Sequence, residues 1–199
     1  MCSSDLSCRV DQPCGESLQT RGVKLIVLDR DGVINHDSAA YIKSPAEWRP
    51  ITGSLQSIAR LNEAGYHVVV ASNQSGVGRG LFDMNTLNAI HAKMHAALAN
   101  TGARVDVVFF CPHAADERCR CRKPATGMLE DIGHRFNTSL SGVPMVGDSL
   151  RDIQAYVRVG GAPMLVLTGN GRKTRRDPAF DTATPVYADL AAAVEALLA

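Results

Sequence analysis

Four residues with metal-binding side chains lie within eleven positions near the middle of the chain, in the segment CPHAADERCRC. Cys111, His113, Cys119 and Cys121 supply three thiols and one imidazole, a set that completes the tetrahedral coordination of zinc. Because no coordination position is left open for water or substrate, we expect a zinc ion bound here to be structural. The alternative is a group of buried free thiols beside a surface histidine.

Two cationic residues, Arg122 and Lys123, follow the last of these cysteines directly. Structural zinc contributes on the order of 10–16 kcal/mol to the folding of small peptides, so a zinc-bound loop can fix the direction of the residues next to it. The compact ammonium of Lys123 suits a phosphate or a phosphorylated carboxylate. The planar guanidinium of Arg122 can bind a second phosphate or sugar oxygens through paired hydrogen bonds.

Three aspartates form a second candidate metal site. Asp29 and Asp31 directly follow a short apolar run, and Asp148 follows another such run. Neighbouring carboxylates repel one another unless a cation lies between them. Carboxylate oxygens favour Mg²⁺, which also binds substrate phosphates. For an isolated D-x-D pair, a turn cap and a solvated loop residue would be the simpler interpretation; the third aspartate and Lys123 favour the metal site.

Apolar runs of strand length alternate with helical patterns from residue 23 onward. Strands are expected over 23–28, 67–72, 104–110, 143–147, 162–167 and 185–188, and helices over 54–65, 83–102, 127–136, 149–160 and 189–199. The strands are apolar throughout, which indicates a parallel sheet with helices on both faces. We therefore predict a Rossmann-like α/β fold in one domain over 21–199, with no large cap domain and a zinc-bound loop. Residues 1–20 are expected to be a disordered leader, and His91, His95 and His134 are interpreted as core or surface histidines.

The polar segments after four of these strands would meet at one edge of the sheet, because ligands of open parallel sheets bind beyond the carboxyl ends of the strands. Residues brought to this edge are Asp29, Asp31, Ser72, Asn73, Lys123 and Asp148. The Ser72 hydroxyl and the backbone N–H groups of 73–76 can bind phosphate oxygens. A flexible loop before the next helix would explain that segment equally well.

Composition and charge narrow the function further. The formal net charge is +1, which gives no support to a nucleic-acid or membrane-surface role. No apolar run approaches the roughly 18 residues needed to span a bilayer. The segment MCSSDLSCRVDQPCGESLQTRG has no apolar stretch of a secretory signal, so we expect a cytoplasmic protein. Cysteines in a reducing cytoplasm favour metal binding over disulfides.

The motifs VLDRDGVIN, ASNQSG, RKP and VGDSLRD, in this order, resemble the four motifs of the haloacid dehalogenase superfamily of phosphohydrolases. The CPH…CRCRKP segment resembles the zinc-binding loop of its D-glycero-D-manno-heptose 1,7-bisphosphate 7-phosphatase branch. The resemblance covers residues 23 to about 173. It departs from the family at Ser72, where many members carry threonine, and in the short spacing between His113 and Cys119.

This resemblance implies a role for each matching residue. Asp29 would attack phosphorus and form an aspartyl-phosphate, and Asp31 would act as general acid and then as general base. Ser72 and Lys123 would hold the phosphoryl oxygens. Mg²⁺ would bind the Asp29 carboxylate, the Asp31 backbone carbonyl and Asp148. Substrate contacts would fall at Asp37, Ser38, Ala39, Ala40, Ser72, Asn73, Gln74, Ser75, Arg122, Lys123 and Ser149.

The implied activity is hydrolysis of the 7-phosphate of a heptose 1,7-bisphosphate, in the cytoplasmic synthesis of nucleotide-activated heptose for lipopolysaccharide core. The expected partner is this small sugar bisphosphate, with no nucleic acid and no membrane, and the expected state is a monomer. Two other hypotheses remain open at this point. One is a histidinol-phosphate phosphatase, since such enzymes share the aspartates and the zinc loop. The other is a catalytically inactive, zinc-stabilised binding module.

Overall fold

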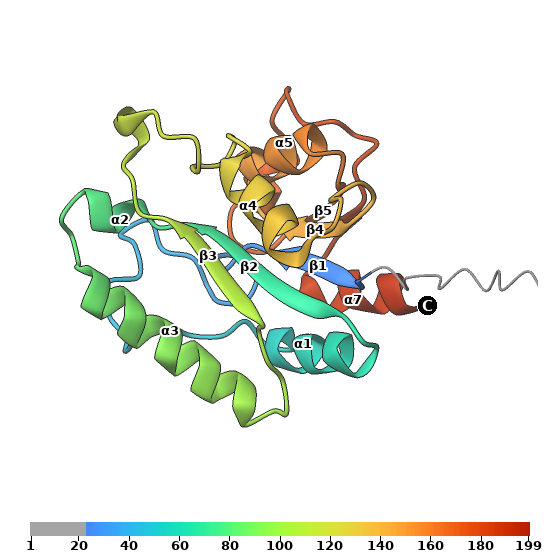
Figure 1. Ribbon diagram of the computed structural model, residues 1–199, viewed down its shortest axis with the longest axis horizontal. Helices are drawn as coiled ribbons and strands as arrows, with labels where there is room; N and C mark the ends of the chain where they lie inside the picture. Colours follow the sequence, from blue (N-terminus) through green and yellow to red (C-terminus); the bar gives the residue numbers. More distant parts are fainter. Residues whose placement is uncertain (1–22) are drawn as a thin grey trace, which may run out of the picture.

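A computed structural model describes residues 23–199, so the predicted leader over 1–20 lies outside the described part (Figure 1). Within these residues, six strands form one sheet in the order β3-β2-β1-β4-β5-β6, and every pairing is parallel. The strands are β1 (Leu25–Leu28), β2 (His67–Asn73), β3 (Val107–Cys111), β4 (Pro144–Gly147), β5 (Ala162–Val166) and β6 (Val186–Tyr187). The predicted parallel α/β fold is confirmed.

Helices cover both faces of the sheet (Figure 1). The longer helices are α1 (Ser54–Glu63), α3 (Met84–Ala99), α4 (Gly127–Phe136), α5 (Leu150–Arg158) and α7 (Leu190–Leu198). Helices α1, α3 and α7 pack on one face, and α4 and α5 on the other. Short turns of helix are α2 (Ser75–Gly78), α6 (Gly171–Thr174) and the 3₁₀ helix η1 (Ala115–Glu117). No cap domain is inserted between the elements described.

The continuous apolar character of the strands follows from burial on both faces. In β1, Ile26 and Leu28 pack into the core beneath α1, α3 and α7, whereas Leu25 and Val27 pack beneath α4 and α5. A strand with one solvated face would have alternated apolar and polar residues. In the described part of the chain, no helix is long and apolar enough to cross a membrane.

Element boundaries differ from the sequence prediction in a few places. The third strand begins at Val107 rather than residue 104, because the Asp106 carboxylate, not a backbone carbonyl, accepts the Val68 N–H at 2.8 Å. Asp83 caps α3 as predicted, with its carboxylate accepting the Thr86 N–H. The short helices α2, α6 and η1 were not predicted, since three or four residues are too few to show a helical period.

The strand order reverses at β1, which lies between β2 and β4. The chain proceeds from β1 outward to β3 and then returns to the other side of β1 to form β4. At such a switch point the loops after neighbouring strands diverge and leave a crevice for a ligand. Asp29 and Asp148 follow the two strands that flank this crevice, and the Asp29 N–H still donates to the Val146 carbonyl at 2.9 Å. The fold therefore places both carboxylates at the same point.

Candidate active site

Three carboxylates and one ammonium meet at the switch point. Oxygens of Asp29, Asp148 and Asp152 lie within 4.8 Å of one another. The Lys123 Nζ lies 3.2 Å from Asp29 Oδ1 and 2.7 Å from Asp152 Oδ1, and it donates to the Ala71 carbonyl at 2.6 Å. Lys123 is only 1% exposed. It therefore lies beneath the aspartates and in direct contact with two of them.

Burial makes this concentration of negative charge unfavourable. Burial, with further repulsion from neighbouring aspartates, raises the pKa of Asp29 to about 7 and that of Asp148 to about 8. Burial alone would lower the pKa of Lys123, but Asp152 and Asp29 raise it above its ordinary value. Burial likewise opposes ionisation of Asp152, yet Lys123 holds the pKa of that carboxyl below its usual range. The ammonium therefore compensates Asp152 and leaves Asp29 and Asp148 in need of a cation.

These carboxylate oxygens fit Mg²⁺, a hard cation that prefers oxygen ligands. Asp29 and Asp148 are the side chains available to bind it. Asp152 is committed elsewhere, because it accepts hydrogen bonds from Lys123 and from the Ser149 N–H and hydroxyl. Its contribution is to hold Lys123 and the first turn of α5 in place.

Two glycines leave the space that the Asp148 carboxylate occupies. Gly32 has a φ of +80°, and a Cβ atom there would overlap the Asp148 carboxylate. Gly169 has a φ of +53°, and a Cβ atom there would overlap the same carboxylate. The next residue, Asn170, donates its backbone N–H to Asp148 Oδ2 at 2.7 Å. The Asp148 side chain is therefore enclosed by the loop after β1 and the loop after β5.

Asp31 lies beside this cluster with its carboxylate held by three neighbours. The Arg30 guanidinium donates from Nε to Oδ1 at 3.1 Å and from Nη2 to Oδ2 at 2.9 Å. The side-chain amide of Asn35 donates to Oδ1 at 2.8 Å, and that of Gln74 donates to Oδ2 at 2.9 Å. The Asp31 side chain keeps 19% of its surface exposed. It is thus held rigidly while it still faces the cavity.

The last two residues of β2 serve two purposes. Ser72 is 1% exposed and its hydroxyl accepts a hydrogen bond from Gln74 Nε2 at 2.8 Å. Asn73 forms a reciprocal pair with the backbone of Lys123: its amide donates to the Lys123 carbonyl at 3.0 Å and its oxygen accepts the Lys123 N–H at 3.1 Å. Asn73 thereby joins the end of β2 to the segment that carries the lysine.

A cavity of about 390 Å³ opens above these groups. It is lined by the predicted residues Asp29, Asp31, Asp37, Ser38, Ala39, Ser72, Asn73, Gln74, Ser75, Arg122, Asp148 and Ser149. Ala40 does not line it, because the chain turns at Ser38, whose hydroxyl accepts the Ala40 N–H. Lys123 lies behind the cavity wall. The sequence prediction did not include Tyr41, Arg79, Arg151, Asp152 and Asn170, which also line the cavity.

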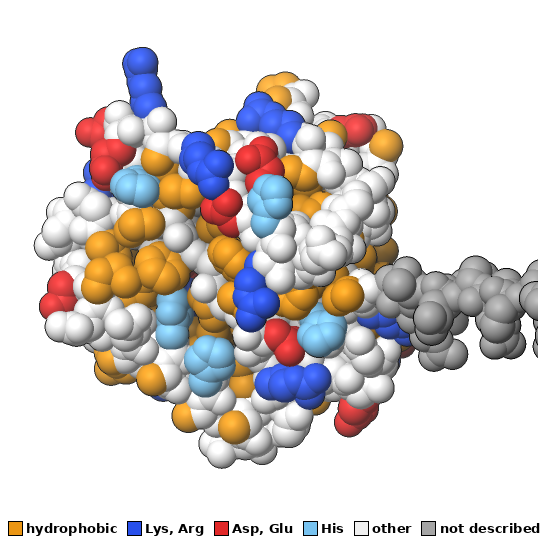
Figure 2. Space-filling view, in the orientation of Figure 1, with side chains coloured by type: hydrophobic (Ala, Val, Ile, Leu, Met, Phe, Trp, Pro, Cys, Tyr) orange, Lys and Arg blue, Asp and Glu red, His pale blue; other side chains and the backbone are white. Residues whose placement is uncertain are grey.

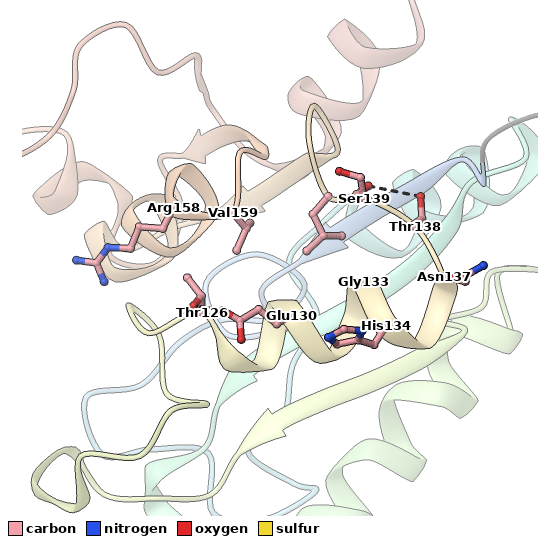
Figure 3. A pocket seen from close by; sticks show the side chains of 10 residues that line it. Thr126, Glu130, Gly133, His134, Asn137, Thr138, Ser139, Arg158 and Val159 are labelled. Atoms are coloured by element: carbon pink, nitrogen blue, oxygen red, sulfur yellow. Dashed lines mark hydrogen bonds between the residues drawn. The ribbon is translucent and has the colours of Figure 1, made fainter.

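A second hollow of about 570 Å³ runs along α4 and the end of α5 (Figure 3). Its lining residues with ionisable side chains are Glu130, His134 and Arg158. Two clusters of metal-binding side chains occur within residues 23–199, and neither includes a residue of this hollow. The hollow has no concentration of reactive groups comparable to that at the switch point, so the smaller cavity is the candidate active site.

The second of those clusters is the predicted zinc site. The Sγ atoms of Cys111 and Cys119 are 3.5 Å apart, as are those of Cys119 and Cys121, and His113 Nδ1 lies 3.3 Å from Cys121 Sγ. Zinc–sulfur bonds of about 2.3 Å place tetrahedral ligands at roughly this separation, so the four side chains fit zinc. Cys111 ends β3 and pairs with Asn73, which anchors the loop to the sheet.

Replacing Cys119 with alanine should remove the zinc and loosen the loop that carries Lys123. We expect Cys119→Ala to contain no zinc by elemental analysis and to melt about 10 °C lower, corresponding to roughly 3–4 kcal/mol. The exposed Asp116→Ala in the same loop is the control and should keep both zinc content and melting temperature. A Cys119→Ala protein with unchanged turnover and melting temperature would disprove a structural role for this site.

Replacing Gly32 with alanine should displace the Asp148 carboxylate. Because catalytic groups moved by about 1 Å can cost 100-fold in rate, we expect Gly32→Ala to lower Mg²⁺-dependent phosphate release by about that factor. The matched control is Gly65→Ala, where φ is +83° but no other atom lies within 4 Å of the added Cβ. The two variants share the backbone strain, so equal activity in both would show that the contact with Asp148 is unimportant.

Comparison with known proteins shows which family this chain resembles. The sequence profile of the family described as polynucleotide kinase 3 phosphatase matches residues 24–160. D-glycero-beta-D-manno-heptose-1,7-bisphosphate 7-phosphatase of Bordetella bronchiseptica is 58% identical over 176 residues, which cover 88% of this chain and 98% of the relative. The crystal structure of the B. bronchiseptica D,D-heptose 1.7-bisphosphate phosphatase, complexed with magnesium and phosphate, superposes with a TM-score of 0.87 and the same coverage of both chains.

A solved structure from Mesorhizobium loti, described as a HAD-like phosphatase, is 32% identical and superposes with a TM-score of 0.71. It covers 96% of this chain and 91% of its own. These similarities extend over most of both chains. The chain belongs to the D-glycero-D-manno-heptose 1,7-bisphosphate 7-phosphatase family of haloacid dehalogenase-like phosphatases.

Proposed function

We propose that this protein hydrolyses the 7-phosphate of D-glycero-D-manno-heptose 1,7-bisphosphate through an aspartyl-phosphate on Asp29, in the synthesis of nucleotide-activated heptose for lipopolysaccharide core. The observation that carries the proposal is the position of Asp29 at the switch point, in contact with Lys123 and within 4.8 Å of Asp148. The 58% identity to a heptose bisphosphate phosphatase supports the choice of substrate.

Asp29 can reach phosphorus only if its repulsion with the phosphate is reduced. Lys123 contributes one positive charge directly beneath the carboxylate, and the Arg30 N–H donates to Asp29 Oδ1 at 2.8 Å. Mg²⁺ held by Asp29, Asp148 and the Asp31 backbone carbonyl would supply the remaining positive charge. Ser72 is directed toward the same region from the end of β2 and binds a phosphoryl oxygen.

Asp31 moves the proton that each step requires. It donates a proton to the sugar oxygen as the bond to phosphorus breaks, and it then accepts a proton from the water that attacks the aspartyl-phosphate. Gln74 and Asn35 hold its carboxylate from either side. A fixed orientation suits this role, because a general acid must lie within hydrogen-bond reach of the leaving oxygen.

The second phosphate of the substrate is best accommodated by arginines at the cavity rim. Arg122 is partly buried, and its burial together with the nearby Arg151 lowers the pKa of its guanidinium below the ordinary value. Two guanidinium groups that disfavour each other are stabilised by an anion bound near both. Asp37, which accepts a hydrogen bond from Asn170 at 2.8 Å, is available for sugar hydroxyls.

The alternative functions are less well supported. Histidinol phosphate carries one phosphate and leaves the Arg122–Arg151 pair without a ligand. A catalytically inactive binding module would lack a reactive carboxylate, whereas Asp29, Asp31 and Asp148 are all present. The matching family profile is named for a polynucleotide phosphatase, which suggests a nucleic acid as another substrate. On the face shown in Figure 2, however, the Lys and Arg side chains form no continuous basic band. We infer that the protein works as a cytoplasmic monomer on a small sugar bisphosphate.

Parallel phosphate-release assays test this proposal. With Mg²⁺ present, the wild-type protein should hydrolyse heptose 1,7-bisphosphate at least about tenfold more efficiently than histidinol phosphate, which corresponds to roughly 1.4 kcal/mol of differential binding in the transition state. Asp29→Asn should abolish release from both, because an amide cannot form the acyl phosphate. A clear preference for histidinol phosphate, or turnover by Asp29→Asn, would contradict the proposal.

A further inference from the structure

A buried hydrogen-bond chain runs from helix α3 to the proposed general acid. Its centre is Arg30, which stands between Asp29 and Asp31 in the sequence. The Arg30 side chain is fully buried. Besides its two bonds to Asp31, the guanidinium donates from Nη2 to Gln74 Oε1 at 3.0 Å, and its Nη1 lies 3.2 Å from His91 Nε2. The proposed reaction assigns no chemistry to either Arg30 or His91.

The direction of these bonds is fixed by the donors. A guanidinium has only N–H donors, so His91 Nε2 must be the acceptor and carries no proton. His91 is 8% exposed, and burial together with the Arg30 charge lowers its pKa to about 4, which keeps the imidazole neutral. The ring also packs against Phe110 of β3 with centroids 5.9 Å apart. The acceptor is therefore held in a fixed position by α3 and β3.

Arg30 in turn orients the Gln74 amide. Because the Gln74 oxygen accepts from Arg30, its NH₂ group must face Asp31 and Ser72, to which it donates at 2.9 and 2.8 Å. One guanidinium therefore sets both the plane of the Asp31 carboxylate and the orientation of the amide that joins Asp31 to Ser72. Its Nη1 is the guanidinium nitrogen that bonds to neither Asp31 nor Gln74, and the contact with His91 gives this nitrogen a partner.

We propose that His91 is a positioning residue for the reaction: it fixes the Arg30 guanidinium and, through it, the carboxylate of Asp31. This inference rests on the proposed function, in which Asp31 transfers the proton. Without the imidazole acceptor, Arg30 Nη1 is left unpaired in a buried position and the guanidinium shifts to find another partner. Asp31 then loses the paired hydrogen bonds that hold it toward the leaving oxygen.

The role of a general acid gives this proposal a specific signature. A sugar alkoxide is a poor leaving group and needs the proton, whereas p-nitrophenolate leaves without one. Misplacing Asp31 should therefore slow phosphoryl transfer from a sugar phosphate much more than transfer from p-nitrophenyl phosphate. General acid catalysis contributes typically 10²–10⁴-fold, so partial misplacement should cost about 10- to 100-fold.

The experiment compares single-turnover phosphorylation of the enzyme by heptose 1,7-bisphosphate and by p-nitrophenyl phosphate in His91→Leu. We expect a loss of about 10- to 100-fold with the sugar, less than about threefold with the aryl phosphate, and little change in KM for the sugar. His91→Gln, which retains an acceptor, should recover most of the loss. His95→Leu, an exposed position one turn along α3, is the control and should match the wild type.

Equal losses with both substrates, or no loss with either, would overturn the proposal. The first result would show a general structural effect, which melting temperatures of the variants would also report. If His91→Leu does not fold, His91→Met provides the same comparison with a more adaptable side chain. Failure of the wild type to release phosphate from heptose 1,7-bisphosphate would refute the proposed function instead, and is thus distinguishable from failure of the role of His91.

Discussion

The rest of this structure depends on one electrostatic constraint: three buried carboxylates lie together, and among the described residues only one ammonium group is present to compensate their negative charge. Asp29, Asp148 and Asp152 converge where the strand order reverses, and Lys123 contacts two of them. Such a group is unstable in an apolar interior unless each charge is paired. The surrounding structure provides this pairing: Lys123 compensates Asp152, and the two remaining carboxylates form a site for Mg²⁺ that a phosphate can share.

The two metal sites therefore have separate tasks linked by one residue. The catalytic carboxylates follow strands of the sheet. The ammonium that contacts them belongs to Lys123, at the end of the cysteine-rich loop, and this loop contains only a short 3₁₀ helix. A zinc ion bound by the four Cys and His side chains would fix that loop at Cys111, where it leaves β3. Asn73 holds the backbone of Lys123 by two reciprocal hydrogen bonds. Arg158 adds a hydrogen bond to the Pro124 carbonyl from α5. The lysine is positioned from three sides before substrate arrives.

The sequence predicted the sheet and most of the cavity lining, because both depend on local signals. Strands buried on both faces are continuously apolar, and the residues that follow parallel strands must meet at one edge. The sequence did not predict Asp152, Asn170 or the contact between Arg30 and His91. Asp152 lies in the first turn of α5, and the direction of that helix depends on packing. Arg30 and His91 are 61 positions apart in the sequence, so no local pattern connects them. The quoted motif VGDSLRD does contain Asp152, and its spacing of four from Asp148 was the available signal.

The central claim concerns charge, so thermal stability with and without Mg²⁺ tests it most directly. Asp148→Asn removes one negative charge while an amide oxygen can still accept the Asn170 N–H. At mildly alkaline pH without Mg²⁺, where the carboxylates are ionised, this variant should melt higher than the wild type, because the repulsion is reduced. Added Mg²⁺ should raise the melting temperature of the wild type and leave the variant unchanged. An ion-free variant that melts lower than the wild type, or an equal gain from Mg²⁺ in both, would contradict the account.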